Sequence, residues 1–160
     1  MSDQDKLWEK IKDIRIAMMT TQEADGTLRS RPMYTQEVEE TPDHLWFFTR
    51  DNSGKVDEIL SDANVNLSYA DPSAQRYVSV SGRAILSRDK SKMEELWHPG
   101  LKAWFPDGLD DPTIALIKVD AEQAEYWEGE SNKLVKLFAM AKAAVTDGDY
   151  DAGENEKLSL

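Results

Sequence analysis

The stretch RYVSVSGRAILS, residues 76–87, alternates apolar and polar side chains through its centre, from Val78 to Ser81. A period of two is typical of a β-strand with one buried face, whereas a helix would repeat every three or four residues. Val78, Val80, Ala84 and Leu86 share one face of this predicted strand. Gly82 predicts a bulge or a close backbone approach within it. A chain organised around so long a strand is expected to be mainly β.

Shorter strands and helices are predicted on both sides of this strand. We expect strands at 15–21, 28–35, 44–50, 64–70, 113–120 and 121–129, and helices at 2–14, 53–62, 89–97 and 131–145. In the second helix Val56, Ile59 and Leu60 are expected to face the core, and Pro32 predicts a bulge in strand 28–35. Residues 98–112 are rich in Pro and Gly and are predicted to form a surface loop. Because strands and helices do not alternate, the pattern favours an antiparallel barrel with flanking helices.

Size and charge narrow the class of protein. The 160 residues, 40% of them hydrophobic, suffice for a single domain with one core, expected over residues 1–145. The net charge of −12 weighs against nucleic-acid and membrane partners. The chain has no cysteine, which excludes thiolate chemistry and fits the cytoplasm. Residues 146–160 are acidic and poor in apolar residues, so we expect a disordered tail there.

A candidate anion site lies where a predicted strand gives way to a helix, in the stretch TRDNSGK. Thr49 and Ser53 offer hydroxyl groups, Lys55 offers a charge, and the start of a helix attracts anions. Arg29 and Arg31, on the preceding strand, can add guanidinium groups. The same residues also suit a helix in which Ser53 is only an N-cap and Lys55 is solvated. The stretch alone does not decide between these interpretations.

Other sites receive little support from the sequence. His44 and His98 lack the spacing of metal ligands, so no metal site is predicted. The chain contains no dinucleotide fingerprint, no P-loop and no hydrolase elbow. Trp97, Trp104 and Trp127 are expected mostly in the core or in a subunit interface, with stacking on a ligand ring as the alternative.

Taken in order, several stretches resemble the general stress protein family within the pyridoxamine phosphate oxidase-like, FMN-binding split barrels. The stretches are RSRPM, LWFFTRDNSGKVDEI, YVSVSGRA, EELWHPGLKAWFPDGLDDP and AEYWEG. The resemblance covers roughly residues 5–137, and its strength comes from the ordered set. It implies an antiparallel split β-barrel and a homodimer with the cofactor at the interface. The implied cofactor is FMN, or FAD in its place.

The resemblance also implies a set of cofactor-binding positions. In such proteins, residues at the end of the third strand and the start of the following helix hold the flavin phosphate. The backbone of the RPM stretch runs past the isoalloxazine ring, and the aromatic residues of the third strand flank that ring. The matching residues here are Arg29, Arg31, Pro32, Met33, Trp46, Phe47, Phe48, Thr49, Ser53 and Lys55.

The resemblance does not assign a reaction or a catalytic residue. It is compatible with a flavin-dependent oxidoreductase acting on an unknown small substrate and with a non-catalytic flavin-binding or flavin-buffering protein. A split barrel that binds another planar cofactor is a third alternative. Pyridoxamine phosphate oxidases carry a late basic substrate site with an Arg and a His, but here no Arg follows Arg88 and no His follows His98. We therefore do not expect this chain to oxidise pyridoxamine phosphate.

Overall fold

The computed structural model describes residues 1–129, 133–146 and 153–160. The helices are α1 (Asp3–Ile11), α2 (Gly54–Ser61), α3 (Lys90–Leu96) and α4 (Lys133–Thr146), with short 3-10 helices η1 (Pro99–Ala103) and η2 (Gly108–Asp110). The strands are β1 (Ile16–Gln22), β2 (Leu28–Tyr34), β3 (Leu45–Arg50), β4 (Asn64–Asp71), β5 (Arg76–Ser87), β6 (Ile114–Gly129) and β7 (Gly153–Ser159).

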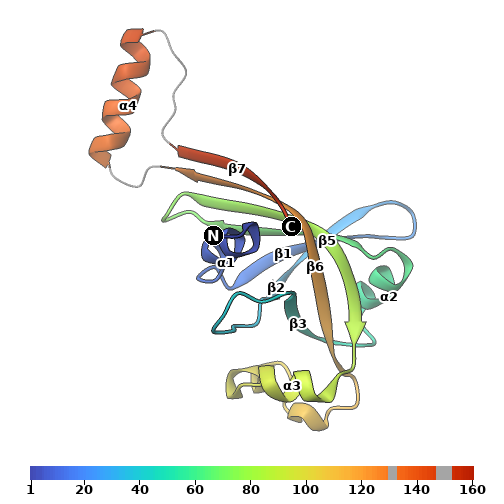
Figure 1. The fold of residues 1–160 in the computed structure, drawn as a ribbon. Helices are drawn as coiled ribbons and strands as arrows, with labels where there is room; N and C mark the ends of the chain where they lie inside the picture. Colours follow the sequence, from blue (N-terminus) through green and yellow to red (C-terminus); the bar gives the residue numbers. More distant parts are fainter. Residues whose placement is uncertain (130–132, 147–152) are drawn as a thin grey trace.

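All of these strands belong to one curled sheet, shown in Figure 1. The strand order is β2-β1-β4-β5-β6-β3, and β7 pairs with the end of β6 on the edge opposite β5, the edge that β3 pairs with at the start of β6. Every pairing is antiparallel. The two ends of this order, β2 and β3, share no ladder among the described residues, so the barrel is split between them. The predicted split-barrel fold is confirmed.

β5 and β6 form the spine of the barrel. Their register shifts between Ser81 and Gly82, which confirms the predicted bulge. A Cβ on Gly82 would lie 2.2 Å from the Asp120 carbonyl oxygen, so only glycine fits at this crossing. The separate strands expected at 113–120 and 121–129 are instead the single strand β6, because β5 supplies partners along almost its whole length.

Two local expectations were wrong. Pro32 pairs with Met18 in an uninterrupted β1–β2 ladder, without the predicted bulge. β2 ends the strand order, and an edge strand tolerates proline because its free side needs no donor. Leu60 is 69% exposed, whereas Val56 and Ile59 are buried as expected, so α2 presents a narrower apolar face to the sheet.

The barrel has a main core and a second, smaller one. The main core fills the barrel interior and includes Ile11 of α1 and Phe47 of β3. The second core joins β3, β6 and α3 to the segment after α3, where Leu101 and Phe105 are buried. Residues 98–112 were predicted to be a surface loop. They instead pack as part of the structure, because their apolar side chains cover the end of β3.

The disordered tail predicted at 146–160 is wrong for the part that the structure describes. β7 pairs with β6 from Gln123↔Ser159 to Gly129↔Gly153. Leu158 is 3% exposed in the main core, and Glu156 accepts hydrogen bonds from Lys6 (2.9 Å) and from the Tyr126 hydroxyl (2.8 Å). Strand pairing and one apolar anchor outweigh the acidic composition. The rest of the expected tail, apart from Thr146 at the end of α4, lies outside the described residues.

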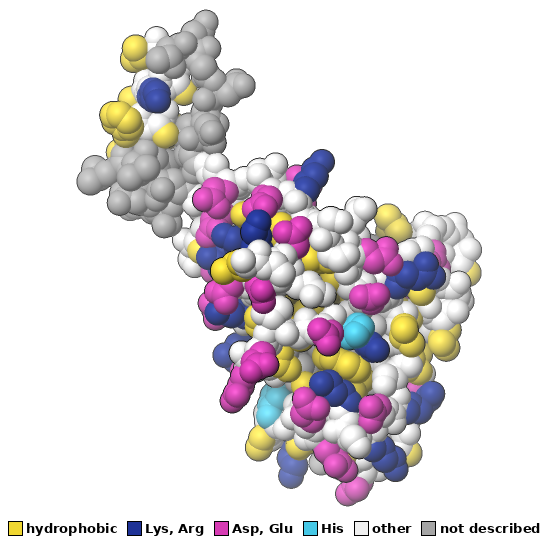
Figure 2. Space-filling model, viewed as in Figure 1, with side chains coloured by type: hydrophobic (Ala, Val, Ile, Leu, Met, Phe, Trp, Pro, Cys, Tyr) yellow, Lys and Arg dark blue, Asp and Glu magenta, His cyan; other side chains and the backbone are white. Residues whose placement is uncertain are grey.

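α4 confirms the predicted helix at 131–145 and stands away from the barrel beyond β6 (Figure 1). Its side chains Leu137, Phe138, Met140 and Val145 are exposed. On the face shown in Figure 2, acidic and basic side chains are interspersed over the barrel. None of the helices in the described parts of the chain combines the length and apolarity that a membrane crossing needs.

Candidate functional site

A cavity of about 470 Å³ opens at the split of the barrel, between β2, β3, the start of α2 and the η1 segment. Its polar lining includes Gln36, Thr49, Arg50, Ser53 and Lys55, and Tyr34 also lines the cavity. Its apolar lining includes Pro32, Met33, Phe48, Leu101, Trp104 and Phe105. The structure therefore brings six of the ten predicted residues to one cavity: Pro32, Met33, Phe48, Thr49, Ser53 and Lys55. A cavity with a mainly apolar lining and a few polar groups is the usual form of a small-molecule site.

Ser53 lies at the polar end of this cavity and has an unused hydroxyl. It occupies the N-cap position of α2, as expected, yet its side chain makes no capping bond. Its buried Oγ has no hydrogen-bond partner in the described structure. A Cβ added to the next residue, Gly54, would meet no atom within 4 Å, so open space lies before the helix. The first N–H groups of a helix also lack intrahelical partners, so donors gather here without an acceptor.

Lys55 supplies an unpaired positive charge at the same place. It is half-buried, and within the described parts of the chain it has neither an ion pair nor a hydrogen bond. Burial, followed by repulsion from the Arg31 guanidinium, lowers the pKa of Lys55 below its ordinary value. An anion bound here would relieve both effects, because it would supply the missing opposite charge. This environment favours the anion-site interpretation over a solvated lysine.

Arg31 does not line the cavity, but its charge affects Lys55. Its guanidinium donates to Glu58 Oε2 at 3.0 Å, to the Met19 carbonyl oxygen at 3.3 Å and to the Thr21 hydroxyl. The Thr21 hydroxyl and then Arg31 lower the pKa of Glu58, which stays ionised. Arg31 is thus tied to α2, does not line the cavity, and acts on Lys55 through its charge.

The remaining predicted residues lie elsewhere. Arg29 is exposed and pairs with Glu23 at 3.1 Å. Phe47 is fully buried in the main core, on the opposite face of β3 from Phe48. Trp46 lines a different hollow. Phe47 points to the other face of β3 from Trp46 and Phe48, because successive side chains of a strand alternate between faces. Trp46 and Phe48 share a face, but they line different hollows.

Gln36 is a cavity residue that the sequence reasoning missed. Its side chain is 3% exposed, and its Oε1 is, with Ser53 Oγ, one of two buried side-chain atoms without a partner among the described residues. A buried polar group left unpaired costs about 1–3 kcal/mol. Both such atoms belong to residues that line this one cavity. No pattern marked Gln36 in advance, since it follows the end of β2 in an irregular segment.

Arg50, Trp104 and Phe105 also line the cavity and were not predicted from the sequence. Arg50 contacts both aromatic residues. Its Nη2 donates to the Trp104 carbonyl oxygen at 2.7 Å, and its guanidinium lies 5.0 Å from the centre of the Phe105 ring. The same guanidinium donates to the Asp111 carboxylate. These contacts fix the η1 segment against the end of β3. Trp104 remains 61% exposed beside the cavity, so one aromatic ring stays open to a ligand.

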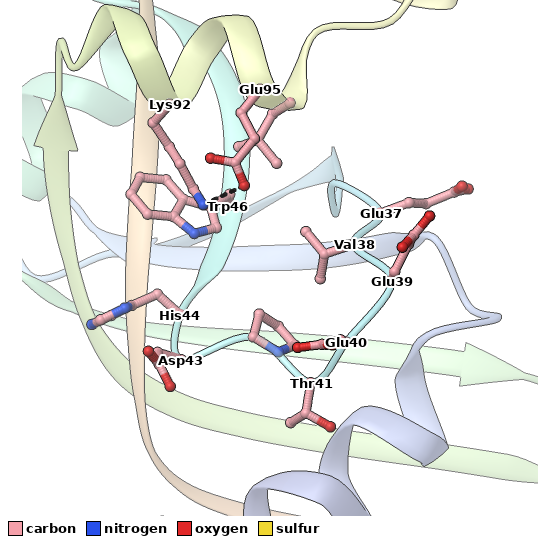
Figure 3. Close-up of a pocket in the computed structure, with 12 residues that line it drawn as sticks. Glu37, Val38, Glu39, Glu40, Thr41, Asp43, His44, Trp46, Lys92 and Glu95 are labelled. Carbon is pink, nitrogen blue, oxygen red and sulfur yellow. Dashed lines mark hydrogen bonds and ion pairs between the residues drawn. The ribbon is translucent and has the colours of Figure 1, made fainter.

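A larger hollow, of about 940 Å³, is lined by the loop that precedes β3 and by residues of β3 and α3 (Figure 3). Glu37, Glu39, Glu40, Asp43 and Glu95 give it an acidic lining. Its lysine, Lys92, pairs with Glu95 at 3.2 Å and lies 5.2 Å from the centre of the Trp46 ring. Such a lining disfavours an anionic ligand.

Comparison with known proteins gives consistent results. A family model described as pyridoxamine 5′-phosphate oxidase like matches residues 2–151. The protein bli-3 of Neurospora crassa is 31% identical over 154 residues, covering 86% of this chain and 74% of that protein.

Solved structures agree with the family match. A candidate general stress protein 26 from Jannaschia sp. CCS1 superposes with a TM-score of 0.76 at 25% identity, covering 96% of this chain and 95% of that one. The general stress FMN/FAD binding protein of Xanthomonas citri superposes with a TM-score of 0.70 at 28% identity, covering 81% and 90% of the two chains. The resemblance read from the sequence is confirmed at the level of the family.

Proposed function

Because this chain belongs to the pyridoxamine 5′-phosphate oxidase-like family, we propose that it binds a flavin, FMN in preference to FAD, in the cavity at the split of the barrel. The observation that carries the proposal is the pair of unpartnered buried atoms, Ser53 Oγ and Gln36 Oε1, lining the same cavity as the unpaired Lys55. A similar protein from Xanthomonas citri is named for FMN/FAD binding.

The two parts of a flavin mononucleotide match the two parts of the cavity. Thr49, Ser53, Lys55 and the first N–H groups of α2 would hold the phosphate, which carries almost two charges. The apolar walls, among them Met33 and Phe48, would enclose the ring. A bound flavin supplies redox chemistry, while these residues bind, orient and shield it.

One unpaired cation in the cavity argues for one phosphate. Lys55 is free, whereas Arg50 is engaged by Asp111 and by the Trp104 carbonyl oxygen. A bound FMN would use Lys55, so the chain as described leaves no unpaired cavity cation for a phosphorylated substrate. We therefore propose that pyridoxamine phosphate is not oxidised. The assay is pyridoxal phosphate formation by FMN-loaded protein in air, and turnover above a free-FMN control would contradict the proposal.

We also propose a homodimer whose interface borders the flavin. Ile16 of β1 is 55% exposed and lines the cavity. On the outer face of the sheet, Tyr77 pairs with Trp127, and these rings are 45% and 43% exposed. A second copy covering these side chains would bury apolar surface and complete the cavity rim. Permanent homodimers commonly bury ~2,000 Å² or more. Light scattering at low micromolar concentration should give twice the monomer mass, and a monomer mass would reject the dimer.

We propose two alternative roles for the protein beyond flavin binding. A flavin-dependent oxidoreductase would turn over a small substrate, whereas a flavin-binding or buffering protein would only hold the cofactor. Reduction of the bound flavin by NADPH, followed by reoxidation by a defined acceptor, favours the first. A chain without cysteine is suited to the cytoplasm, which we propose as its location.

The decisive experiment is a titration of the purified chain with FMN, followed by flavin fluorescence. We expect saturable binding of one FMN per chain and weaker binding of riboflavin, which lacks the phosphate. FAD is the second ligand to titrate, since a phosphate end open to solvent would admit its extra nucleotide. Absence of saturable binding for all three would reject the proposed function and would turn attention to another planar cofactor.

A further inference from the structure

Gln36 has a side chain that is fixed in place but only partly used. It lies between β2 and β3, and its backbone N–H donates to the Trp46 carbonyl oxygen at 2.9 Å. Its Nε2 donates to the Tyr34 carbonyl oxygen at 3.2 Å. These two bonds hold the amide group, and Oε1 is left without a partner among the described residues. An amide oxygen can only accept, so the missing partner is a hydrogen-bond donor.

The position of Gln36 along the cavity limits which part of a ligand it meets. Its backbone adjoins Trp46, which precedes Thr49 by three residues on β3. Three residues of a strand span ~10 Å. Gln36 therefore lies well away from the end where Thr49, Ser53 and Lys55 gather, beyond the reach of a phosphate held there. A ring that extends from that phosphate reaches this region.

We propose that Oε1 of Gln36 accepts a hydrogen bond from a ring N–H of the bound ligand and so selects heterocycles that carry such a donor. In an oxidised flavin the ring bears a single N–H, at N3 between two carbonyl groups. This inference rests on the proposed flavin function and adds a specificity residue to it. Sites that hydrogen-bond a ligand group reject analogues lacking that group far more strongly than apolar pockets do, because the site is then left with an unpaired polar atom.

The experiment compares FMN with N3-methyl-FMN, which keeps the phosphate and the ring but lacks the donor. Affinities are measured by flavin fluorescence titration for the native protein, Gln36→Met and Gln36→Glu. Methionine has a similar length and no acceptor oxygen, whereas glutamate keeps an oxygen at the same position. Both variants lose the amide donor to Tyr34, and they differ in the acceptor oxygen and in the charge that glutamate carries. Ser53→Ala serves as the matched control at the other end of the cavity.

We expect the native protein to prefer FMN over its N3-methyl analogue by about tenfold or more, the scale of a lost hydrogen bond. Gln36→Met should bind the two almost equally, and Gln36→Glu should keep the preference. Ser53→Ala should weaken both ligands by the same factor and keep their ratio.

The outcomes separate this inference from the function on which it rests. If the native protein binds neither ligand, the proposed flavin function fails. If it binds FMN tightly but does not distinguish the methylated analogue, the flavin function stands and the role of Gln36 is overturned. A preference that persists unchanged in Gln36→Met would show that the methyl group clashes with another part of the cavity, and this result also overturns the role of Gln36.

Discussion

The two hollows beside β3 differ in what their polar groups are bonded to. In the larger one the lysine is paired with Glu95, Glu37 pairs with Arg15 at 2.6 Å, and Thr41 donates to Asp5 at 2.7 Å. In the smaller one Lys55 has no partner in the described structure, and neither Ser53 Oγ nor Gln36 Oε1 is satisfied. In the larger hollow, which has an acidic lining, several polar groups already have protein partners. In the smaller one a cation, a hydroxyl group and an amide oxygen have no partner among the described residues.

This difference shows that volume alone does not identify a binding site. A folded chain tends to satisfy its buried polar groups, so groups left unsatisfied together require an explanation. Burial and the nearby Arg31 disfavour the charged form of Lys55, which burdens the ligand-free protein. A ligand that carries both a phosphate and a ring donor would remove these costs at once. The variants below test whether the two hollows differ in function as they do in bonding.

The largest expected effect is on stability, at a residue that lines neither hollow. Leu158 of β7 is 3% exposed in the main core. Leu158→Ala should lower the free energy of unfolding by about 2–5 kcal/mol, the range for buried leucine truncations. Urea unfolding monitored by circular dichroism measures it. FMN affinity should stay within twofold below the unfolding transition.

The neighbouring exposed residue provides the control for this variant. Lys157→Ala, on the same strand, should leave the free energy of unfolding within about 0.5 kcal/mol. If Leu158→Ala behaves like Lys157→Ala, then β7 does not anchor the barrel, as expected of a disordered tail. If Leu158→Ala abolishes FMN binding while the protein is still folded, then the shape of the cavity depends on packing around Leu158, which does not line it.

The next effect compares the two lysines directly. Lys55→Ala should weaken FMN binding by about 1.5–3 kcal/mol, the scale of a hydrogen bond to a charged group. Lys92→Ala, in the larger hollow, should leave FMN affinity unchanged. Fluorescence titration measures both. Equal FMN affinities for Lys55→Ala and the native protein would show that Lys55 does not bind the phosphate.

Among the predicted residues that the structure brings to one cavity, three owe their proximity to local order. Thr49, Ser53 and Lys55 follow one another across a strand end and a helix start, so their proximity is fixed by the backbone of one short segment. The strand at residues 76–87 and the bulge at Gly82 could also be predicted, because each is indicated by the order of neighbouring residues.

The residues that were missed come together only through tertiary packing. Gln36 lies in an irregular segment, and Trp104 and Phe105 belong to a stretch that composition marked as a loop. Arg50 links that stretch to β3 by contacts across more than fifty positions of sequence, which no periodicity reveals. β7 could not be predicted for the same reason. It is a strand because it pairs with β6, whereas its acidic composition indicates disorder.

A third expected effect is a dependence of FMN affinity on pH, which tests the charge of Lys55 separately from the shape of its side chain. Phosphate binding needs the ammonium form, so FMN affinity should fall as pH rises through the pKa of Lys55, about tenfold per unit above it. Because the pKa of Lys55 is lowered in the free protein, this fall should begin below the ordinary lysine value of 10.5. Lys55→Arg should move the alkaline fall to higher pH, since arginine stays charged and only the loss of the ring N–H then weakens binding.

The stability of the ligand-free protein should respond to pH with the opposite sign. The folded pKa of Lys55 is below its unfolded value, so the unfolded chain binds more protons between the two values. The contribution of this residue to stability therefore rises with pH in that window, while FMN affinity falls. Comparing native protein with Lys55→Met in urea isolates this contribution, and identical pH profiles for the two would contradict the lowered pKa.

The smallest expected effect is at the tryptophans, one beside each hollow. Trp104 is 61% exposed beside the smaller cavity, and a flavin ring that packs against it should quench its emission. Trp104→Leu should weaken FMN binding by about 0.5–1.5 kcal/mol, the increment of an aromatic pair over apolar burial. Trp46→Leu should leave FMN affinity unchanged, because Lys92 and Lys118 already lie over that ring, at 5.2 and 5.8 Å from its centre. Titration with FMN while tryptophan emission is recorded tests both rings at once. Quenching that survives in Trp104→Leu but disappears in Trp46→Leu would move the ring of the ligand to the larger hollow and would reverse the assignment of the two sites.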